Sequence, residues 1–149
     1  MNNSPFNKES YKPSQSLLKD KVILVTGAGD GIGREAAETY ARYGATVILL
    51  GKTTAKLEKV YDAIEAAGGP LPAIYPMNLE GAAAKDYQDL ANVISNEFGK
   101  LDGLLNNASI LGALSPIENQ NIENWYKVQQ VNVNATFMLT QACLPLLKQ

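Results

Sequence analysis

The chain has 149 residues, of which 46% are hydrophobic and 19% are charged, a composition typical of one globular domain with its own core. Its formal net charge of −2 gives no basic excess for binding nucleic acid, and no apolar run approaches the roughly 20 residues that span a bilayer. It has no histidine and one cysteine, so we expect neither a histidine general base nor a metal site.

The first sixteen residues are polar and rich in Asn, Ser and Pro. They predict a flexible lead-in over residues 1–16, followed by a single domain over residues 17–149. They contain no apolar stretch of the kind found in secretory signals. The lone Cys143 cannot form a disulfide within the chain, so we expect a reducing, cytoplasmic setting.

From there the chain alternates short apolar runs with amphipathic segments, a pattern typical of a parallel α/β sheet. The apolar runs predict strands at residues 22–26, 46–50, 73–77 and 101–105. Helices are predicted at residues 31–43, 54–67 and 82–98, and from 121 or 124 to about 147, after a loop over residues 106–120. Pro72 and Pro76 favour an edge position for the third strand, and Pro145 favours a kink near the chain's end.

Right-handed crossovers between these strands predict the order 3-2-1-4 in a Rossmann-type, doubly wound sheet. As given, this sheet would be truncated after the fourth strand and its following helix, which makes an incomplete Rossmann domain. In such sheets, ligands bind at the C-terminal strand ends where the strand order reverses, here between strands 1 and 4.

A glycine-rich turn joins the first strand to the first helix. The spacing G-x-G-x-x-G fails, because Ile32 and Arg34 occupy the positions of its last glycine. The form T-G-x-x-x-G-x-G fits instead and suits a tight turn, close approach of a pyrophosphate and close helix packing. Since a helix N-terminus also attracts phosphate, we predict cofactor contacts from Gly27, Gly29, Asp30, Gly31, Ile32 and Gly33.

Three further motifs accompany this turn: Asn106-Asn107-Ala108 after the fourth strand, Asn78-Leu79 after the third, and Asn132 in the last helix. With them, the chain from about residue 17 onward resembles the short-chain dehydrogenases/reductases. The runs 41–51 and 131–141 look especially like bacterial YciK-type members of that family. Two residues depart from the family pattern: Ser109 replaces a glycine, and Asn78 replaces the customary Asp.

The resemblance implies an oxidoreductase that transfers hydride between a nicotinamide dinucleotide and a carbonyl or alcohol substrate. It adds cofactor contacts from Asn78, Leu79, Asn107, Ala108 and Ser109. It also implies a catalytic role for Asn132, which would hold a water of the proton relay. The family's catalytic serine and Tyr-x-x-x-Lys lie beyond this asparagine, and no Tyr-x-x-x-Lys occurs in the sequence.

We therefore expect the cofactor-binding N-terminal part of an oxidoreductase, inactive on its own. The alternative is a non-enzymatic dinucleotide-binding or regulatory module.

The second strand ends in Leu50-Gly51-Lys52, where an acid would select NAD by binding both ribose hydroxyls. A cation there can pair with a 2′-phosphate, so Gly51 and Lys52 are predicted cofactor contacts and NADP(H) is favoured over NAD(H). Two points weigh against this. Lys52 could be an ordinary solvated lysine, and NADP-binding relatives often carry a cation where this chain has Asp30.

The last helix carries a stripe at spacings of three and four that is apolar except for one asparagine: Trp125, Val128, Asn132, Ala135, Leu139 and Ala142. From this pattern Asn132 could equally be a core asparagine with satisfied hydrogen bonds. Leu144, Leu146 and Leu147 are expected to be exposed and to favour a homo-oligomer.

Overall fold

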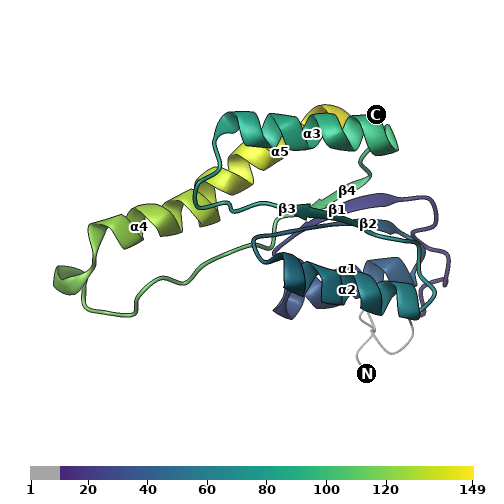
Figure 1. The fold of residues 1–149 in the computed structure, drawn as a ribbon, viewed down its shortest axis with the longest axis horizontal. Coiled ribbons are helices and arrows are strands. Elements are labelled where there is room, and N and C mark those ends of the chain that lie inside the picture. The colour runs from purple at the N-terminus through teal and green to yellow at the C-terminus, as the bar shows by residue number, and fades with distance from the viewer. Residues whose placement is uncertain (1–10) are drawn as a thin grey trace, which may run out of the picture.

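A computed structural model describes residues 11–149, so most of the predicted lead-in, residues 1–10, lies outside the described part. Four parallel strands form one sheet in the order β3-β2-β1-β4, which confirms the predicted Rossmann-type topology. Helices α1 and α2 cover one face of the sheet, and α3 and α5 cover the other (Figure 1). The elements are β1 Val22–Thr26, α1 Gly31–Arg42, β2 Thr46–Gly51, α2 Thr54–Ala66, β3 Ala73–Pro76, α3 Ala84–Phe98, β4 Gly103–Leu105, a 3-10 turn Ile117–Asn119, α4 Ile122–Gln129 and α5 Ala135–Leu147.

The central strands are buried on both faces, which explains their continuous apolar runs. Along β1, Leu24 joins the core under α3 and α5, whereas Val25 joins the core under α1 and α2. In β2, Ile48 and Leu49 divide in the same way. Successive side chains of a strand point to opposite faces, so β1 and β2 pack against both helical layers. This packing fixes the position of the C-terminal ends of the two strands.

The predicted last helix is interrupted. A π-helical turn at Gln130–Asn134 separates α4 from α5, and the helix continues through Pro145 to Leu147. Because α4, before this turn, has no buried residue, the predicted stripe was wrong in its first half. Trp125 is 54% exposed and Asn132 is also exposed. The buried residues are Val131, Ala135, Leu139, Cys143 and Leu146, so the expectation that Leu146 is exposed was also wrong.

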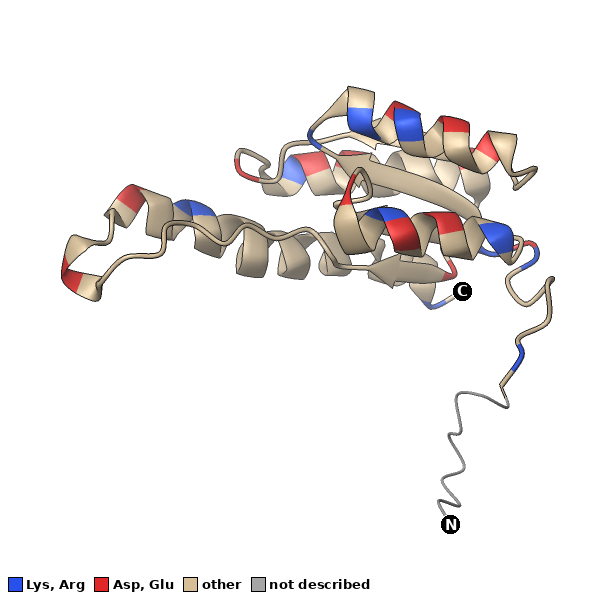
Figure 2. Cartoon of the chain, turned by 90° about the horizontal axis from the view of Figure 1, so that it is seen from below, with Lys and Arg blue, Asp and Glu red and all other residues tan. Residues whose placement is uncertain are grey.

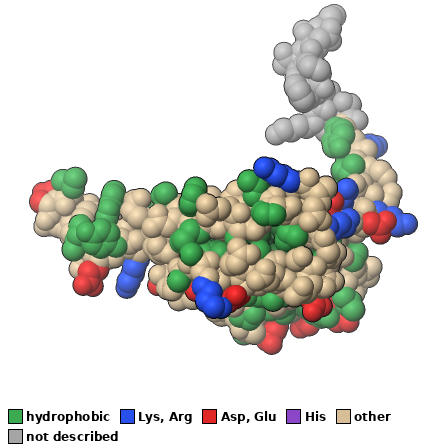
Figure 3. All heavy atoms as spheres, turned by 90° about the horizontal axis from the view of Figure 1, so that it is seen from above, with side chains coloured by type: hydrophobic (Ala, Val, Ile, Leu, Met, Phe, Trp, Pro, Cys, Tyr) green, Lys and Arg blue, Asp and Glu red, His purple; other side chains and the backbone are tan. Residues whose placement is uncertain are grey.

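Together, α4 and the loop before it form an arm that extends away from the sheet (Figure 1). Hydrophobic side chains gather on this arm in the space-filling view (Figure 3). The large exposed apolar residues of the arm, the π-helical turn and α5 are Leu111, Leu114, Ile117, Ile122, Trp125, Tyr126, Val133, Phe137 and Leu144, so the prediction that Leu144 is exposed is confirmed.

Basic and acidic residues are interspersed along the helices and also occur on the arm (Figure 2). Within residues 11–149, no helix combines the length and apolar character needed to cross a membrane.

Candidate functional site

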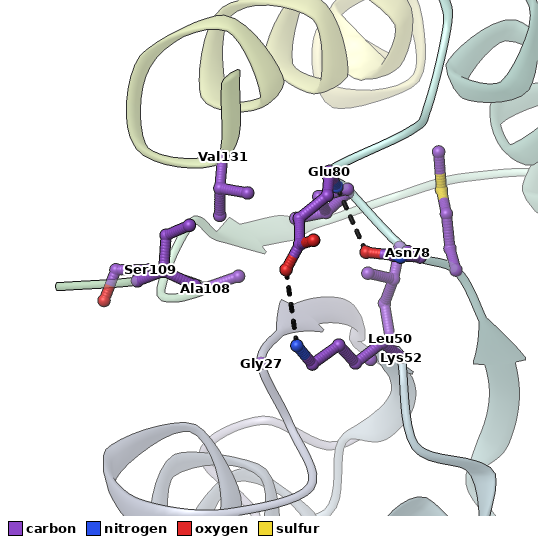
Figure 4. A pocket seen from close by; sticks show the side chains of 12 residues that line it. Gly27, Leu50, Lys52, Asn78, Glu80, Ala108, Ser109 and Val131 are labelled. Carbon is purple, nitrogen blue, oxygen red and sulfur yellow. Dashed lines mark hydrogen bonds and ion pairs between the residues drawn. The ribbon is translucent and has the colours of Figure 1, made fainter. Parts of the chain in front are cut away.

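The C-terminal ends of the strands open into a cleft made of two adjoining cavities. Both cavities are lined by the glycine turn, the end of β2 and the segment after β4, and the first also by the segment after β3. Of the predicted cofactor contacts, all but Gly33 line one or both cavities: Gly27, Gly29, Asp30, Gly31, Ile32, Gly51, Lys52, Asn78, Leu79, Asn107, Ala108 and Ser109. Figure 4 shows part of this lining around Lys52 and Asn78. The fold therefore brings together residues that are up to 82 positions apart in the sequence, from Gly27 to Ser109. They meet at the C-terminal strand ends, where the sequence predicted a ligand site.

The backbone of the glycine turn needs glycine at three positions for two different reasons. Gly27 and Gly31 have φ angles of +64° and +52°, a region that other residues rarely adopt. A Cβ on Gly33 would collide with the Gly27 carbonyl oxygen and lie 2.5 Å from Asn107 Nδ2. A Cβ on Gly31 would meet no atom within 4 Å, so the turn is open to a ligand at that point.

The N-terminus of α1 offers hydrogen-bond donors to this open space. The Asp30 carboxylate caps the helix by accepting from the Gly31 N–H at 2.8 Å. The N–H groups of Ile32 and Gly33 donate to no acceptor within residues 11–149. Free N–H groups at the positive end of a 12-residue helix suit a pyrophosphate, so the turn fits the cofactor that its sequence predicts.

Thr26 links the glycine turn to the segment after β4. Its side chain is 2% exposed, and its hydroxyl accepts from the N–H groups of Asn107 and Ala108 at 3.0 and 2.9 Å. The same hydroxyl donates to the Leu105 carbonyl at 3.3 Å. The Asn107 side chain in turn donates to the Thr26 carbonyl at 3.0 Å. These bonds set the separation between the two walls of the cleft.

Asn132 contacts the far end of that segment. Its Oδ1 accepts from the Ile110 N–H and its Nδ2 donates to the Ile110 carbonyl, both at 2.9 Å. Since the side chain is exposed, Asn132 is not the core asparagine that the helical stripe suggested. It instead fixes the backbone of Ile110, which lines the cleft next to Ser109. The π-helical turn aims it there, consistent with the frequent occurrence of such turns at functional sites.

Two lysines at the mouth of the cleft are paired with acids. Lys52 Nζ lies 3.4 Å from Glu80 Oε1, and the backbone N–H of Glu80 donates to Asn78 Oδ1 at 3.1 Å (Figure 4). Lys56 Nζ lies 2.7 Å from Asp30 Oδ2. The hydrogen bond from Lys56, helped by the Gly31 N–H, lowers the pKa of Asp30 below its ordinary value. The acid at position 30 therefore faces a cation of α2, so it does not stand as an isolated negative charge.

Sequence reasoning missed several residues of the site, chiefly Thr26, Lys56, Glu80 and Ile110. The position of Glu80 follows from strand register, because Gly51 of β2 pairs with Pro76 of β3 and the segments that follow lie side by side. The predicted strand order could have placed these two segments together, but no local pattern marks Glu80. Among the described residues 11–149, no group of three or more acidic or cysteine side chains could hold a metal ion.

The family model for short chain dehydrogenases matches residues 21–149. The chain is 54% identical over 137 residues to the oxidoreductase YciK of Escherichia coli K12, covering 92% of this chain and 54% of YciK. A short chain dehydrogenase from Pseudomonas syringae superposes with a TM-score of 0.90 at 55% identity, covering 93% of this chain and 56% of that one.

A short chain dehydrogenase from Shigella flexneri, crystallised in complex with NADP, superposes with a TM-score of 0.87 at 53% identity. The match covers 89% of this chain and 56% of the Shigella chain. The chain thus spans little more than half the length of these relatives. The glycine turn, the sheet order and these matches agree, and the chain belongs to the short-chain dehydrogenase/reductase family.

Proposed function

We propose that this chain is the cofactor-binding part of an NADP(H)-dependent oxidoreductase that acts on a carbonyl or alcohol. The observation that carries the proposal is the open glycine turn at the N-terminus of α1, where two N–H groups lack an acceptor within the described chain. The complex of the Shigella relative with NADP supports the choice of cofactor.

In this proposal, each part of the dinucleotide has its own residues. The pyrophosphate would lie over Gly31 and the N-terminus of α1. The adenosine would lie between the end of β2, at Lys52, and Asn78 and Leu79 after β3. The segment from Asn107 to Ser109 would border the remainder of the cofactor. When bound, the nicotinamide ring supplies or accepts the hydride.

The preference for NADP(H) would come from Lys52. It is the cation that follows β2, no acid takes that position, and its ammonium group points across the cleft (Figure 4). An ammonium group can pair with a 2′-phosphate but gains little from a 2′-hydroxyl.

Calorimetric titration with NADP and NAD tests this preference. Lys52→Gln should weaken NADP binding about tenfold, the effect of losing roughly 1.4 kcal/mol, and leave NAD binding unchanged. Lys59→Gln is the matched control, since it removes the same charge from an exposed position on α2. Equal or tighter binding of NAD by the unaltered chain would contradict the preference.

For the chemical step, we propose that Asn132 holds the relay water, supported by its exposed position at the edge of the cleft. Beyond its two hydrogen bonds to Ile110, its amide keeps one N–H and one oxygen lone pair for a water. The sequence contains no Tyr-x-x-x-Lys, the pair that would supply the acid and lower its pKa. We therefore expect this polypeptide to bind NADPH without oxidising it in the presence of simple aldehydes or ketones. Turnover by the pure chain in an absorbance assay would contradict this part of the proposal.

We also propose that the chain associates with itself in a reducing, cytoplasmic setting. Exposed apolar side chains, such as Trp125 on the arm and Phe137 on α5, support association. The lone cysteine, Cys143, is consistent with a reducing setting. Light scattering should report a mass above 16.0 kDa, and a monodisperse monomer would overturn the oligomer.

A further inference from the structure

Glu80 places a carboxylate at the part of the cleft where the end of β2 has none. It comes from the segment after β3 and reaches toward Lys52, with 3.4 Å between Oε1 and Nζ (Figure 4). Its backbone is fixed by the hydrogen bond from its N–H to Asn78 Oδ1. The Glu80 side chain is 31% exposed and lines the same cavity as Lys52, Asn78 and Gly27.

The surroundings of Glu80 give it no structural task that would explain this position. The ion pair with Lys52 joins two side chains that are 31% and 62% exposed, and such a pair contributes little to stability. No other cation forms an ion pair with Glu80 in the part of the chain that the structure describes. We therefore expect the Glu80 carboxylate to matter mainly for how Lys52 binds a ligand.

We propose that Glu80 is a specificity-determining residue that limits the preference of this site for a 2′-phosphate over a 2′-hydroxyl. The inference rests on the proposed function, because it assumes that the adenosine ribose lies beside Lys52. Glu80 would act through Lys52 by holding its ammonium group and partly neutralising it, so a bound 2′-phosphate must displace the carboxylate.

The two ribose forms make different demands on the Lys52 ammonium group. A phosphate monoester carries a charge of about −1.5 to −2 at pH 7, so it competes with the Glu80 carboxylate for that ammonium group. A ribose hydroxyl carries no charge and leaves the pair between Glu80 and Lys52 in place. Because the pair is exposed and screened by salt, the effect should be several-fold and should shrink at high ionic strength.

The test measures binding of adenosine 2′,5′-bisphosphate and adenosine 5′-monophosphate, which differ only in the 2′-phosphate. Glu80→Gln should raise the ratio of their affinities about three- to tenfold in favour of the bisphosphate at low salt. Most of this gain should disappear in a Lys52→Gln background, since Glu80 acts through Lys52. Glu97→Gln is the control, because it removes the same charge from an exposed position at the far end of α3.

The inference would be overturned if Glu80→Gln left the ratio of bisphosphate to monophosphate affinity unchanged or lowered it. It would also be overturned if Glu80→Gln raised this ratio equally with and without Lys52. A merely structural role for Glu80 would alter both affinities alike and leave their ratio unchanged, which counts against the proposal. If the unaltered chain binds NADP while Glu80→Gln leaves the ratio unchanged, the inference alone fails. If the unaltered chain binds neither NADP nor the bisphosphate, the proposed function itself fails.

Discussion

At the scale of single residues, the cleft depends on one buried hydroxyl. Thr26 Oγ1 accepts two backbone N–H groups, from Asn107 and Ala108, and donates to the Leu105 carbonyl. A buried donor left without its acceptor costs about 1–3 kcal/mol, more than the net gain from forming a typical hydrogen bond. Thr26 therefore holds two walls of the cleft together although it does not line either cavity itself.

Thr26→Val should destabilise the chain by about 1–3 kcal/mol, because it keeps the shape of the side chain but leaves the Ala108 N–H without its acceptor. The Asn107 N–H keeps its second acceptor, the Leu105 carbonyl, at 3.1 Å. Thr26→Ser keeps the hydroxyl and is the matched control, with an expected loss of roughly 1 kcal/mol for the missing methyl group. Urea unfolding followed by circular dichroism measures both. Equal losses for the two variants would show that the methyl group matters and the hydroxyl does not.

The site residues that could be predicted from the sequence were those whose role follows from their immediate neighbours in the chain. Gly27 and Gly31 were predictable because a positive φ angle and an open approach at a strand-to-helix turn require glycine whatever surrounds them. Lys52 was predictable because it directly follows a buried strand. The partner of Lys52 was not, because Glu80 is 28 positions away and its place depends on the register of β2 and β3.

At the scale of elements, the strands and most helices were predictable from the period of their apolar residues. The exception is the last helix, where a π-helical turn at Gln130–Asn134 adds a residue to one turn and α4, before that turn, extends away from the sheet. A stripe counted at spacings of three and four assumes an unbroken helix, so it placed Trp125 with Asn132 on the core side. The true buried face begins at Val131.

The N-terminal ends of β1 and β4 are joined by a charged cluster around Asp102. Its carboxylate accepts from the Val22 N–H at 2.9 Å and from Lys21 at 3.1 Å, and Lys100 lies 3.1 Å away. Burial alone would raise the pKa of Asp102, but these hydrogen bonds outweigh burial and lower it below its ordinary value. The cluster ties the outer strand β4 to the centre of the sheet.

A lowered pKa in the folded state means that Asp102 stabilises the fold above its unfolded pKa, and that this contribution is lost as pH falls through the folded value. Asp102→Asn should therefore cost about 1–2 kcal/mol at pH 7, and this cost should shrink as pH falls below about 3.9, where aspartate titrates when unperturbed. Urea unfolding between pH 7 and 2.5 tests this, with Asp62→Asn on α2 as the control. A constant difference between Asp102→Asn and the unaltered chain across this range would exclude the linkage.

At the scale of the whole molecule, two helical layers and one sheet make a scaffold whose cleft opens where the strand order reverses. The two helical layers pack on opposite faces of β1 and β2, so the glycine turn at the end of β1 rests on the best-buried part of the fold. The chain spans little more than half the length of its relatives, and the arm leaves a row of apolar side chains exposed. In the proposed function, the described residues supply the cleft that would hold the dinucleotide.

The most direct test of this account is a titration of the isotope-labelled chain with NADP, followed by the chemical shifts of its backbone amides. We predict the largest changes at Gly31 to Gly33, at Lys52 and from Asn107 to Ile110, which line or adjoin the cleft. Amides around the cavity between α1 and α2, at Arg42 and from Gly68 to Gly69, should not change. Chemical-shift changes confined to the cavity between α1 and α2, or no changes at the N-terminus of α1, would contradict the central claim that the glycine turn binds the cofactor's phosphates.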